Sequence, residues 1–360
     1  MTIYLLGAFI LSLVCGLFFT PLILDFCKRK KLYDIPNERK VHETAIPRLG
    51  GISFLPSMLT AFAIMLIILT FRRQQSLPIN TWSFGFILGL TIIYCIGVVD
   101  DLIGLNATTK FAAQIVSASL LPLVGLYINN LHGFCGVYEI PVTVGIPLTI
   151  FVIVFIDNAL NLIDGIDGLA SGLSFLALGG FLLYFIHYQV FTYTYTFITV
   201  SMMGALLAFI YFNLFGKAEK NSKIFMGDSG SLSLGFTLGF LAVKCAMNNT
   251  NIWPERDEAL LLPVTLLFVP VADMVRVIIY RISHRKPLFK ADKNHIHHKL
   301  MRAGLNQHQT LAVILLLTIS IYALNYLLYP TFSSTAIVAI NTLIYILVNI
   351  AINHSIKSVT

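Results

Sequence analysis

The sequence predicts an all-α polytopic membrane protein, and three observations support this fold class. Hydrophobic residues make up 57% of the 360 residues and charged residues only 11%, whereas soluble domains average about 25% charged residues. Apolar runs of roughly 20 residues, the length that spans about 30 Å of hydrocarbon as a helix, recur along the chain. Only short linkers join these runs, so we expect a single integral membrane domain over residues 1–360.

The apolar runs predict about eleven membrane-spanning helices. They lie at about 3–25, 50–71, 82–99, 111–128, 141–157, 168–187, 192–212, 230–247, 259–280, 310–328 and 335–353. The fifth is the least regular, because Pro141 and Pro147 fall in its first half. The first run is not expected to be a cleaved signal peptide, since it lacks a basic start and is followed by Lys28–Lys31.

Lysine and arginine residues set the expected orientation. One side of the expected bundle collects 20 of the 24 basic residues. The exceptions are Arg72, Arg73, Lys244 and Arg256. By the positive-inside rule the basic side faces the cytoplasm, which puts the N-terminus outside and the C-terminus in the cytoplasm. The net charge of +7 mostly reflects this bias, although an anionic substrate would also suit it.

Five polar motifs interrupt the apolar chain, and the expected topology puts all five on the cytoplasmic side. They are residues 36–42, Asp100-Asp101, residues 158–168, residues 227–231 and residues 295–298. Carboxylates, amides, histidines and cations at one membrane face indicate a metal-assisted phosphate site, and the apolar remainder indicates a lipid substrate. A transporter is the competing class, but its binding groups should lie near mid-membrane on broken helices.

Asp100 and Asp101 end the third expected span. Adjacent carboxylates repel each other and hold protons more tightly unless a cation neutralises them. Because the preceding residues are apolar, we expect at least one of the two to be buried; a solvated helix end is the alternative. Lys110, at the start of the fourth span, could contact a phosphate or serve only as a membrane anchor.

Residues 158–168 offer two amides and two carboxylates with no basic residue. Asn158 and Asn161 are three apart, as are Asp164 and Asp167, so each pair would share a face if helical. These oxygen ligands suit Mg²⁺, which prefers carboxylates, carbonyl groups and substrate phosphates. A hydrophilic turn that caps the next helix is the structural alternative.

The motif at residues 227–231 opens the eighth expected span. Free backbone N–H groups and the positive end of a helix favour a phosphate at such a position. Asp228 could ligate the metal that the phosphate carries. Helix capping alone would explain an aspartate or a serine here, but not the two glycines as well.

Three histidines, His295, His297 and His298, follow the ninth expected span in a basic loop. Zinc binding is one interpretation, although no cysteine and little acid stand beside them in sequence. Contact with a pyrophosphate or nucleotide, helped by Lys293, is a second, and a plain surface loop is a third.

Asp273 and Arg276 lie three residues apart inside the ninth expected span. Ionisable groups at membrane depth are costly and are usually paired, so a structural ion pair is expected here. The five cysteines form neither a metal-binding spacing nor a disulfide framework. Only Cys135 and Cys245 lie near the outer face, which leaves a bridge between them open.

In this order, the motifs resemble the polyprenyl-phosphate N-acetylhexosamine-1-phosphate transferases over about Asp34 to His298. That family transfers a sugar 1-phosphate from a UDP-sugar to a polyprenyl phosphate, typically with magnesium, and releases UMP. The first loop (34–51) and the sequence His-Ile-His-His at 295–298 resemble the N-acetylglucosamine branch. The branch acting on the peptidoglycan muropeptide usually carries three consecutive histidines. Lys293 departs from the pattern, because it lacks the bidentate fork of the expected arginine.

The resemblance implies roles for individual residues. Asp228 and Asn161 would ligate Mg²⁺, with Mn²⁺ as a substitute, and Asp100 would position or deprotonate the lipid phosphate with Asp101 beside it. Asp164 and Asp167 would assist the nucleotide or the metal. The remaining expected substrate contacts are Lys110, Asn158, Arg39, His42, His295, His297, His298 and Lys293.

We therefore expect a multi-pass enzyme of the bacterial cytoplasmic (inner) membrane, with its active site on the cytoplasmic face. Its expected partners are a UDP-N-acetylhexosamine, undecaprenyl phosphate and the lipid bilayer, with no nucleic acid; a homodimer is compatible with the sequence. The product would start a lipid-linked cell-envelope polysaccharide. The alternatives are a UDP-muropeptide transferase, a transporter and a phosphatidyl-alcohol synthase, whose D-G-x-x-A-R-type pattern is not found.

Overall fold

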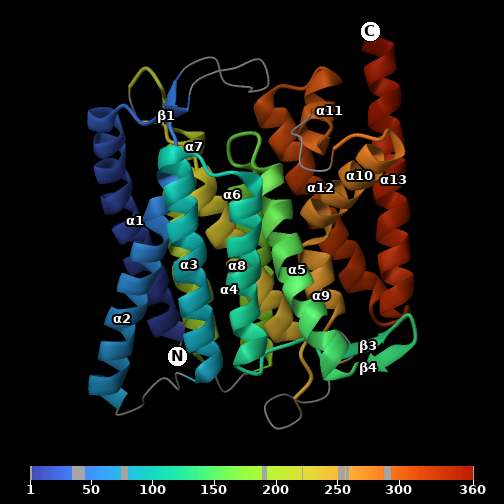
Figure 1. Ribbon diagram of the computed structural model, residues 1–360, viewed down its shortest axis with the longest axis horizontal. Coiled ribbons are helices and arrows are strands. Elements are labelled where there is room, and N and C mark those ends of the chain that lie inside the picture. The colour runs from blue at the N-terminus through green and yellow to red at the C-terminus, as the bar shows by residue number, and fades with distance from the viewer. Residues whose placement is uncertain are drawn as a thin grey trace.

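The computed structural model describes residues 2–34, 45–73, 80–188, 193–220, 222–249, 256, 259–287 and 293–359. The fold is nearly all-α, with long helices packed side by side (Figure 1). Among the described helices, nine are long and apolar enough to cross a membrane. They are α1 (Thr2–Lys30), α2 (Phe54–Arg73, preceded by the 3-10 turn η1 at Gly50–Ser53), α3 (Thr81–Ile103), α5 (Val142–Ile163), α6 (Leu169–His187), α7 (Tyr193–Leu214), α8 (Gly227–Ala246), α12 (Gln307–Leu328) and α13 (Ser334–Val359). The polytopic membrane fold is confirmed.

Two of the eleven expected spans differ from the prediction, so the count of eleven is not confirmed. The fourth, expected at 111–128, is α4 (Ala107–Leu123), which has 17 residues. The ninth, expected at 259–280, is divided at Leu267 into α9 (Leu261–Leu266) and α10 (Phe268–Ser283).

Proline chemistry explains the break in the ninth span. Pro270 has no N–H group to donate to the carbonyl four residues earlier, that of Leu266. The hydroxyl of Tyr322 on α12 donates to this Leu266 oxygen instead, at 2.6 Å. The freed backbone group is therefore satisfied by a neighbouring helix, as membrane helices require.

The two ends of the bundle differ in what they carry (Figure 1). The C-terminus lies at the same end as α11 (Ile296–Arg302) and as β1 (Tyr33–Asp34), which pairs antiparallel with β2 (Ile46–Pro47). The N-terminus lies at the opposite end, with the hairpin of β3 (Asn130–Phe134) and β4 (Val137–Glu139). Because of these two strand pairs, the described part of the chain is nearly, rather than entirely, all-α. Cys135 and Cys245 are both free thiols, so the bridge left open by the sequence is absent.

Helix α8 lies at the centre of the bundle, and every residue from Ser229 to Ala246 is buried. It packs against α3, α5 and η1. Gly51 of η1 approaches α8 so closely that a Cβ atom there would lie 2.1 Å from the Cα atom of Gly230. The Gly51 N–H also donates to the Met226 carbonyl at 2.8 Å. The paired glycines of the first loop therefore seat that loop against the start of α8.

Candidate active site

A cavity of about 1130 Å³ opens where the end of α3, the end of α5 and the start of α8 meet. Predicted site residues from four of the five polar motifs line it. They are Asp100, Asp101, Asn161, Asp164, Asp167, Asp228 and His298. The sequence separations among these motifs are large, so their convergence comes from helix packing.

Two carboxylates at the cavity share one ammonium group. The Nζ atom of Lys110 lies 3.2 Å from Asp100 Oδ2 and 2.7 Å from Asp228 Oδ2. Asn106 caps the N-terminus of α4, because its side-chain oxygen accepts the N–H of Thr109. Lys110 therefore lies in the first turn of this helix. The positive charge of the lysine thus offsets part of the repulsion between these two acids.

Asn161 lies on the other side of Asp228. Its Nδ2 atom is 3.2 Å from Asp228 Oδ1 and 2.9 Å from the hydroxyl of Ser231. Helix α5 runs to Ile163, six residues beyond its expected end at 157, and this extension carries Asn161 to the cavity. The predicted metal pair, Asp228 and Asn161, is therefore adjacent in space.

Asp101 has a different environment from its neighbour Asp100. Its side chain is buried, and its two oxygens accept the backbone N–H groups of Asp228 at 2.8 Å and Ser229 at 2.9 Å. The expectation that these two N–H groups are free for a phosphate is wrong, because a carboxylate already caps the helix. Asp101 therefore fixes the first turn of α8, which carries Asp228.

Asn158 shares α5 with Asn161 but faces away from the cavity. Its Nδ2 atom donates to Gln114 Oε1 at 2.7 Å and to the Val154 carbonyl at 2.8 Å. Asn158 is not among the cavity-lining residues. The structure thus gives this predicted substrate contact a packing role between α4 and α5.

Asp164 lies just after α5, at the wall of the cavity. Burial in the surrounding protein raises the pKa of this carboxyl to about 7, with further increases from the carboxylates of Asp228, Asp167 and Asp101. Because Asp164 and Asp167 lie in a loop rather than in a helix, they do not share a helical face.

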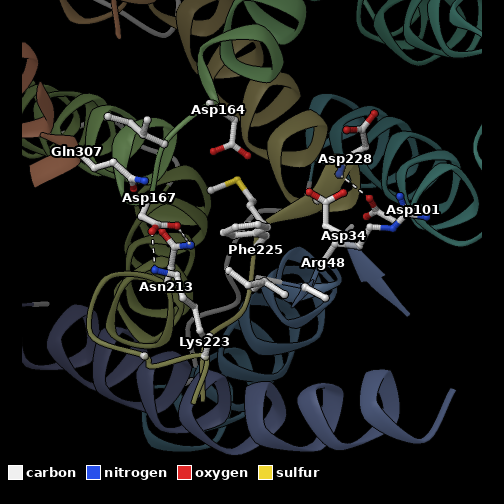
Figure 2. Close-up of a pocket in the computed structure, with 18 of the residues that line it drawn as sticks. Asp34, Arg48, Asp101, Asp164, Asp167, Asn213, Lys223, Phe225, Asp228 and Gln307 are labelled. Carbon is white, nitrogen blue, oxygen red and sulfur yellow. Dashed lines mark hydrogen bonds and ion pairs between the residues drawn. The ribbon is translucent and has the colours of Figure 1, made fainter. Parts of the chain in front are cut away.

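Asp167 is tied to the segment that precedes α8. Lys223 Nζ lies 2.6 Å from Asp167 Oδ2, and the amide of Asn213 donates to Asp167 Oδ1 at 3.3 Å. Asn213 also accepts the N–H of Gly168 at 2.7 Å. Figure 2 shows Asp167 and Asn213 on one side of the cavity and Asp228 on the other, with Phe225 between them.

The three histidines have unequal positions. His298 lines the cavity, whereas His295 and His297 are buried behind it. The ring of His297 fills the space beside Gly165, where a Cβ atom would lie 2.1 Å from its Nε2 atom. Burial, with the neighbouring rings of His298 and His295, lowers the pKa of His297 to about 3, so this ring is neutral.

Some predicted residues are not at the cavity. Lys293 is exposed and is not among the lining residues. Arg39 and His42 lie outside the described residues. The sequence interpretation did not assign a site role to several residues that do line the cavity: Arg48, Asn213, Lys217, Lys223 and Phe225. Arg48 stands in the first-loop motif, but the others carry no recognisable spacing.

The donor set at the cavity fits a hard divalent cation. Asp100 and Asp228 direct carboxylate oxygens at one cation position, now held by Lys110, and Asn161 adds an amide. Mg²⁺ is often bound through one or two protein carboxylates, with waters and substrate phosphates completing its octahedron. Within the described part of the chain, no group of three or more His, Cys, Asp or Glu side chains is placed to hold a metal ion.

A second cavity, of about 1290 Å³, lies between α5, α10 and α13. Most of its lining is apolar, for example Phe151 and Phe155 of α5. Arg276, Lys299 and Arg302 add cationic groups to it. His298 and Lys299 are adjacent on α11 yet line different cavities, so α11 stands between the two.

Comparison with known proteins gives consistent matches. The profile of glycosyl transferase family 4 matches residues 83–246. A Bacillus subtilis (strain 168) protein, described as a probable undecaprenyl-phosphate N-acetylglucosaminyl 1-phosphate transferase, is 30% identical over 321 residues, which cover 86% of this chain and 81% of the relative. The decaprenyl-phosphate N-acetylglucosaminephosphotransferase of Mycobacterium leprae is 32% identical, over 85% of this chain and 79% of the relative.

The undecaprenyl-phosphate alpha-N-acetylglucosaminyl 1-phosphate transferase of Escherichia coli (strain K12) is 31% identical over 328 residues, 87% of this chain and 83% of the relative. These relatives are matched over most of their length, and the residues that match the family profile include Asp100, Asn161 and Asp228 of the cavity. The resemblance inferred from the motifs is confirmed. The chain is a multi-pass membrane protein of glycosyl transferase family 4 and belongs to the polyprenyl-phosphate N-acetylhexosamine-1-phosphate transferases.

Proposed function

We propose that the protein transfers N-acetylglucosamine 1-phosphate, or the 1-phosphate of a closely related N-acetylhexosamine, from a UDP-sugar to undecaprenyl phosphate. The observation that carries the proposal is the Asp100–Lys110–Asp228 cluster in a polar cavity, with an apolar cavity on the other side of α11. The names of the three relatives support the same acceptor class and sugar.

The polar cavity would take the nucleotide sugar. Its lining includes Arg48, Lys217 and Lys223, whose charges suit a diphosphate. Phe225 offers an aromatic face on which a uracil ring could stack. Asp167 lies across the cavity from Asp228, with Asp164 between them, and both carboxylates would assist the nucleotide.

Mg²⁺, with Mn²⁺ as a substitute, is assigned to Asp228 and Asn161, with Asp100 nearby. When bound, the ion would offset the negative charge of the diphosphate and stabilise the charge that develops on the leaving UMP. Lys110 would turn from the two carboxylates toward phosphate oxygens as the substrates enter. Asp101 would keep Asp228 in place by holding the start of α8.

In the proposed reaction, an oxygen of the lipid phosphate attacks the sugar-bearing phosphorus. The bond from this phosphorus to the bridging oxygen breaks, and UMP leaves with that oxygen. Asp100 would orient the lipid phosphate and accept its proton when the phosphate arrives as a monoanion. A lipid phosphate is already nucleophilic near neutral pH, so direct attack is favoured over an aspartyl-phosphate intermediate.

The apolar cavity would hold part of the prenyl chain. Its volume of about 1290 Å³ and its apolar walls suit an isoprenoid. Lys299 and Arg302 would attract the anionic head group toward α11. Burial and the neighbouring Arg276 lower the pKa of Lys299 to about 8, so Lys299 still carries its charge over most of the neutral range.

The active site is assigned to the cytoplasmic side of the bacterial inner membrane. The strong bias of basic residues supports this orientation through the positive-inside rule. UDP-sugars are cytosolic, which agrees with the same assignment. The spans are joined by short linkers in the sequence, with no long inserted segment to contact a muropeptide, so a simple sugar is favoured.

Purified protein should be incubated with undecaprenyl phosphate and one of three donors: UDP-N-acetylglucosamine, UDP-glucose or the UDP-muropeptide. We expect UMP release to be fastest with UDP-N-acetylglucosamine, by about 100-fold or more over UDP-glucose, because a site that hydrogen-bonds the acetamido group rejects a donor lacking it. A muropeptide preference would overturn the branch assignment alone. No UMP from any donor would refute the transferase proposal.

The metal assignment has its own test. Excess chelator should abolish UMP release, and Asp228→Ala should abolish it even with added Mg²⁺ or Mn²⁺. Asn158→Ala is the control on α5, the helix that carries Asn161, because Asn158 faces Gln114 rather than the cavity and its loss should leave most of the activity. Full activity in chelator, or in Asp228→Ala, would contradict a metal held by Asp228.

A further inference from the structure

Helix α11 is too short to hold its own position. It has seven residues, Ile296–Arg302, and isolated helices shorter than about 12 residues are marginal in water. Yet it carries His298, which lines the polar cavity. The placement of His298 must therefore come from contacts that other elements make with this segment.

One buried carboxylate binds the start of this segment. Asp273 on α10 is 1% exposed. Its Oδ2 atom lies 2.7 Å from Nδ1 of His295, and its Oδ1 atom accepts the backbone N–H of Ile296 at 3.0 Å. Asp273 thus binds both the residue that precedes α11 and the first N–H group of the helix, where a negative charge is favoured.

Two further donors hold the carboxylate itself. Arg276 Nη2 lies 2.8 Å from Asp273 Oδ1, and the hydroxyl of Tyr345 on α13 donates to the same oxygen at 3.1 Å. The Arg276 guanidinium also donates to the carbonyl of Asn294, just before His295. Asp273 therefore joins α10 and α13 to the start of α11, and its ion pair with Arg276 is the predicted one.

The opposite side of α11 meets the loop that carries two site carboxylates. The ring of His297 rests on Gly165, next to Asp164, and leaves no room for a Cβ atom there. The rings of His295 and His297 are nearly parallel, with centroids 5.9 Å apart. A shift of His295 would therefore be transmitted to His297 and to its neighbour His298, whose ring centroid is 4.1 Å from that of His297.

We propose that Asp273 is a positioning residue of the donor site, which acts through His295 to hold His298 at the cavity wall. This inference rests on the proposed function, because it assigns His298 to the UDP-sugar. The inference also assigns a specific role to His295, whose Nδ1 atom binds Asp273. In this role His295 does not need to contact the substrate.

A pair of variants at His295 tests this purpose. Asparagine can place an amide N–H where histidine has Nδ1, so His295→Asn should keep the bond to Asp273 and stay within about threefold of wild type in kcat/KM for UDP-N-acetylglucosamine. His295→Ala should lose about tenfold or more, as a small misplacement of a site can cost up to about 100-fold. Equal losses in both variants would overturn the assignment, since His295 would then act through Nε2.

A double-mutant cycle tests the route through His298. Asp273→Asn should lower kcat/KM for the donor about tenfold in the wild-type background and less than about twofold in a His298→Ala background. In a Lys223→Ala background, on a different part of the cavity wall, the loss should remain about tenfold. Equal losses in all three backgrounds would refute positioning through His298.

Tyr322→Phe is the control for general loosening of the same broken helix, because the Tyr322 hydroxyl donates to the Leu266 carbonyl. It should lower the unfolding temperature in detergent while kcat/KM stays within about twofold. If Asp273→Asn does not fold, the two His295 variants still decide the matter. The wild-type protein releasing no UMP would instead indicate failure of the proposed function.

Discussion

Lys110 and Asp228 are 118 residues apart in sequence, yet the Lys110 Nζ atom lies 2.7 Å from Asp228 Oδ2. The same Nζ atom lies 3.2 Å from Asp100 Oδ2. One cation therefore joins α4 to both α3 and α8 at the cavity. A divalent cation and this lysine would draw on the same carboxylate oxygens, so their binding should be linked.

This linkage predicts that Lys110→Met lowers two quantities, the turnover number and the Mg²⁺ concentration needed for half-maximal activity. The turnover number should fall by about 100-fold or more, as expected when a charged group that stabilises the transition state is lost. The Mg²⁺ concentration for half-maximal activity should also fall, because the ammonium no longer competes for Asp228. Titrating UMP release with Mg²⁺ in the variant, with Lys110→Arg as the charge-retaining control, measures both. A higher Mg²⁺ requirement in Lys110→Met would contradict the competition.

Asp101 and Asp100 should differ in their effects on stability. Asp101→Ala leaves two buried N–H groups of α8 without their acceptor, which should cost about 1–3 kcal/mol. Asp100→Ala should cost less, because Asp100 accepts one backbone N–H and shares a partly exposed lysine. Thermal unfolding of both variants in detergent measures the difference. Equal destabilisation would show that losing the acceptor of the two α8 N–H groups costs no more stability than losing Asp100.

Asp164 should make stability depend on pH in the absence of metal. Its folded pKa, about 7, lies above its ordinary value, so the folded protein binds the proton more tightly than the unfolded chain does. Stability should therefore fall as pH rises from about 4 to about 7 and then level off. The unfolding temperature in chelator at about pH 5 and about pH 8 measures this slope. Asp164→Asn should make this slope shallower; an unchanged slope would assign the titration to another group.

Native Cys135 provides a direct test of orientation. It is exposed in the β3–β4 hairpin, at the end of the bundle opposite α11. An impermeant thiol reagent should label Cys135 in intact cells, and Cys135→Ser should remove this signal. A cysteine introduced at the exposed Lys31, in the Cys135→Ser background, should be labelled only after the cells are opened. The reverse pattern would place the active site outside.

The spans and the meeting of the motifs were predictable because apolar length and charge bias depend only on the sequence. The end of α5 was not. Asn158 and Asn161 appear to close an apolar run, yet the helix continues because Gln114 satisfies Asn158 and Asp228 accepts from Asn161. A polar residue ends a membrane span only when no partner lies beside it, and partners are a property of the packed bundle.

The different environments of Asp100 and Asp101 could not be predicted from the sequence either. Successive residues on a helix point about 100° apart, so two different environments are expected for them. Which one faces the cavity depends on how α3 is rotated against α8. Lys223 and Asn213 were missed for a related reason, because they reach the cavity from the α7–α8 connection, which has no distinctive pattern.

The four hydrogen-bond donors to Asp273 are not all synthesised at the same stage as Asp273 itself. Arg276 arrives one turn later in the same helix, but His295, Ile296 and Tyr345 are synthesised afterwards. A buried carboxylate that lacks its hydrogen-bond partners is costly. Helix α10 is synthesised before three of the four partners of Asp273, and this set of donors is complete only after Tyr345 of α13 has been made. A truncation before Tyr345 would therefore remove one donor to Asp273 and weaken the link between α10 and α11, although the truncated residues lie in α13.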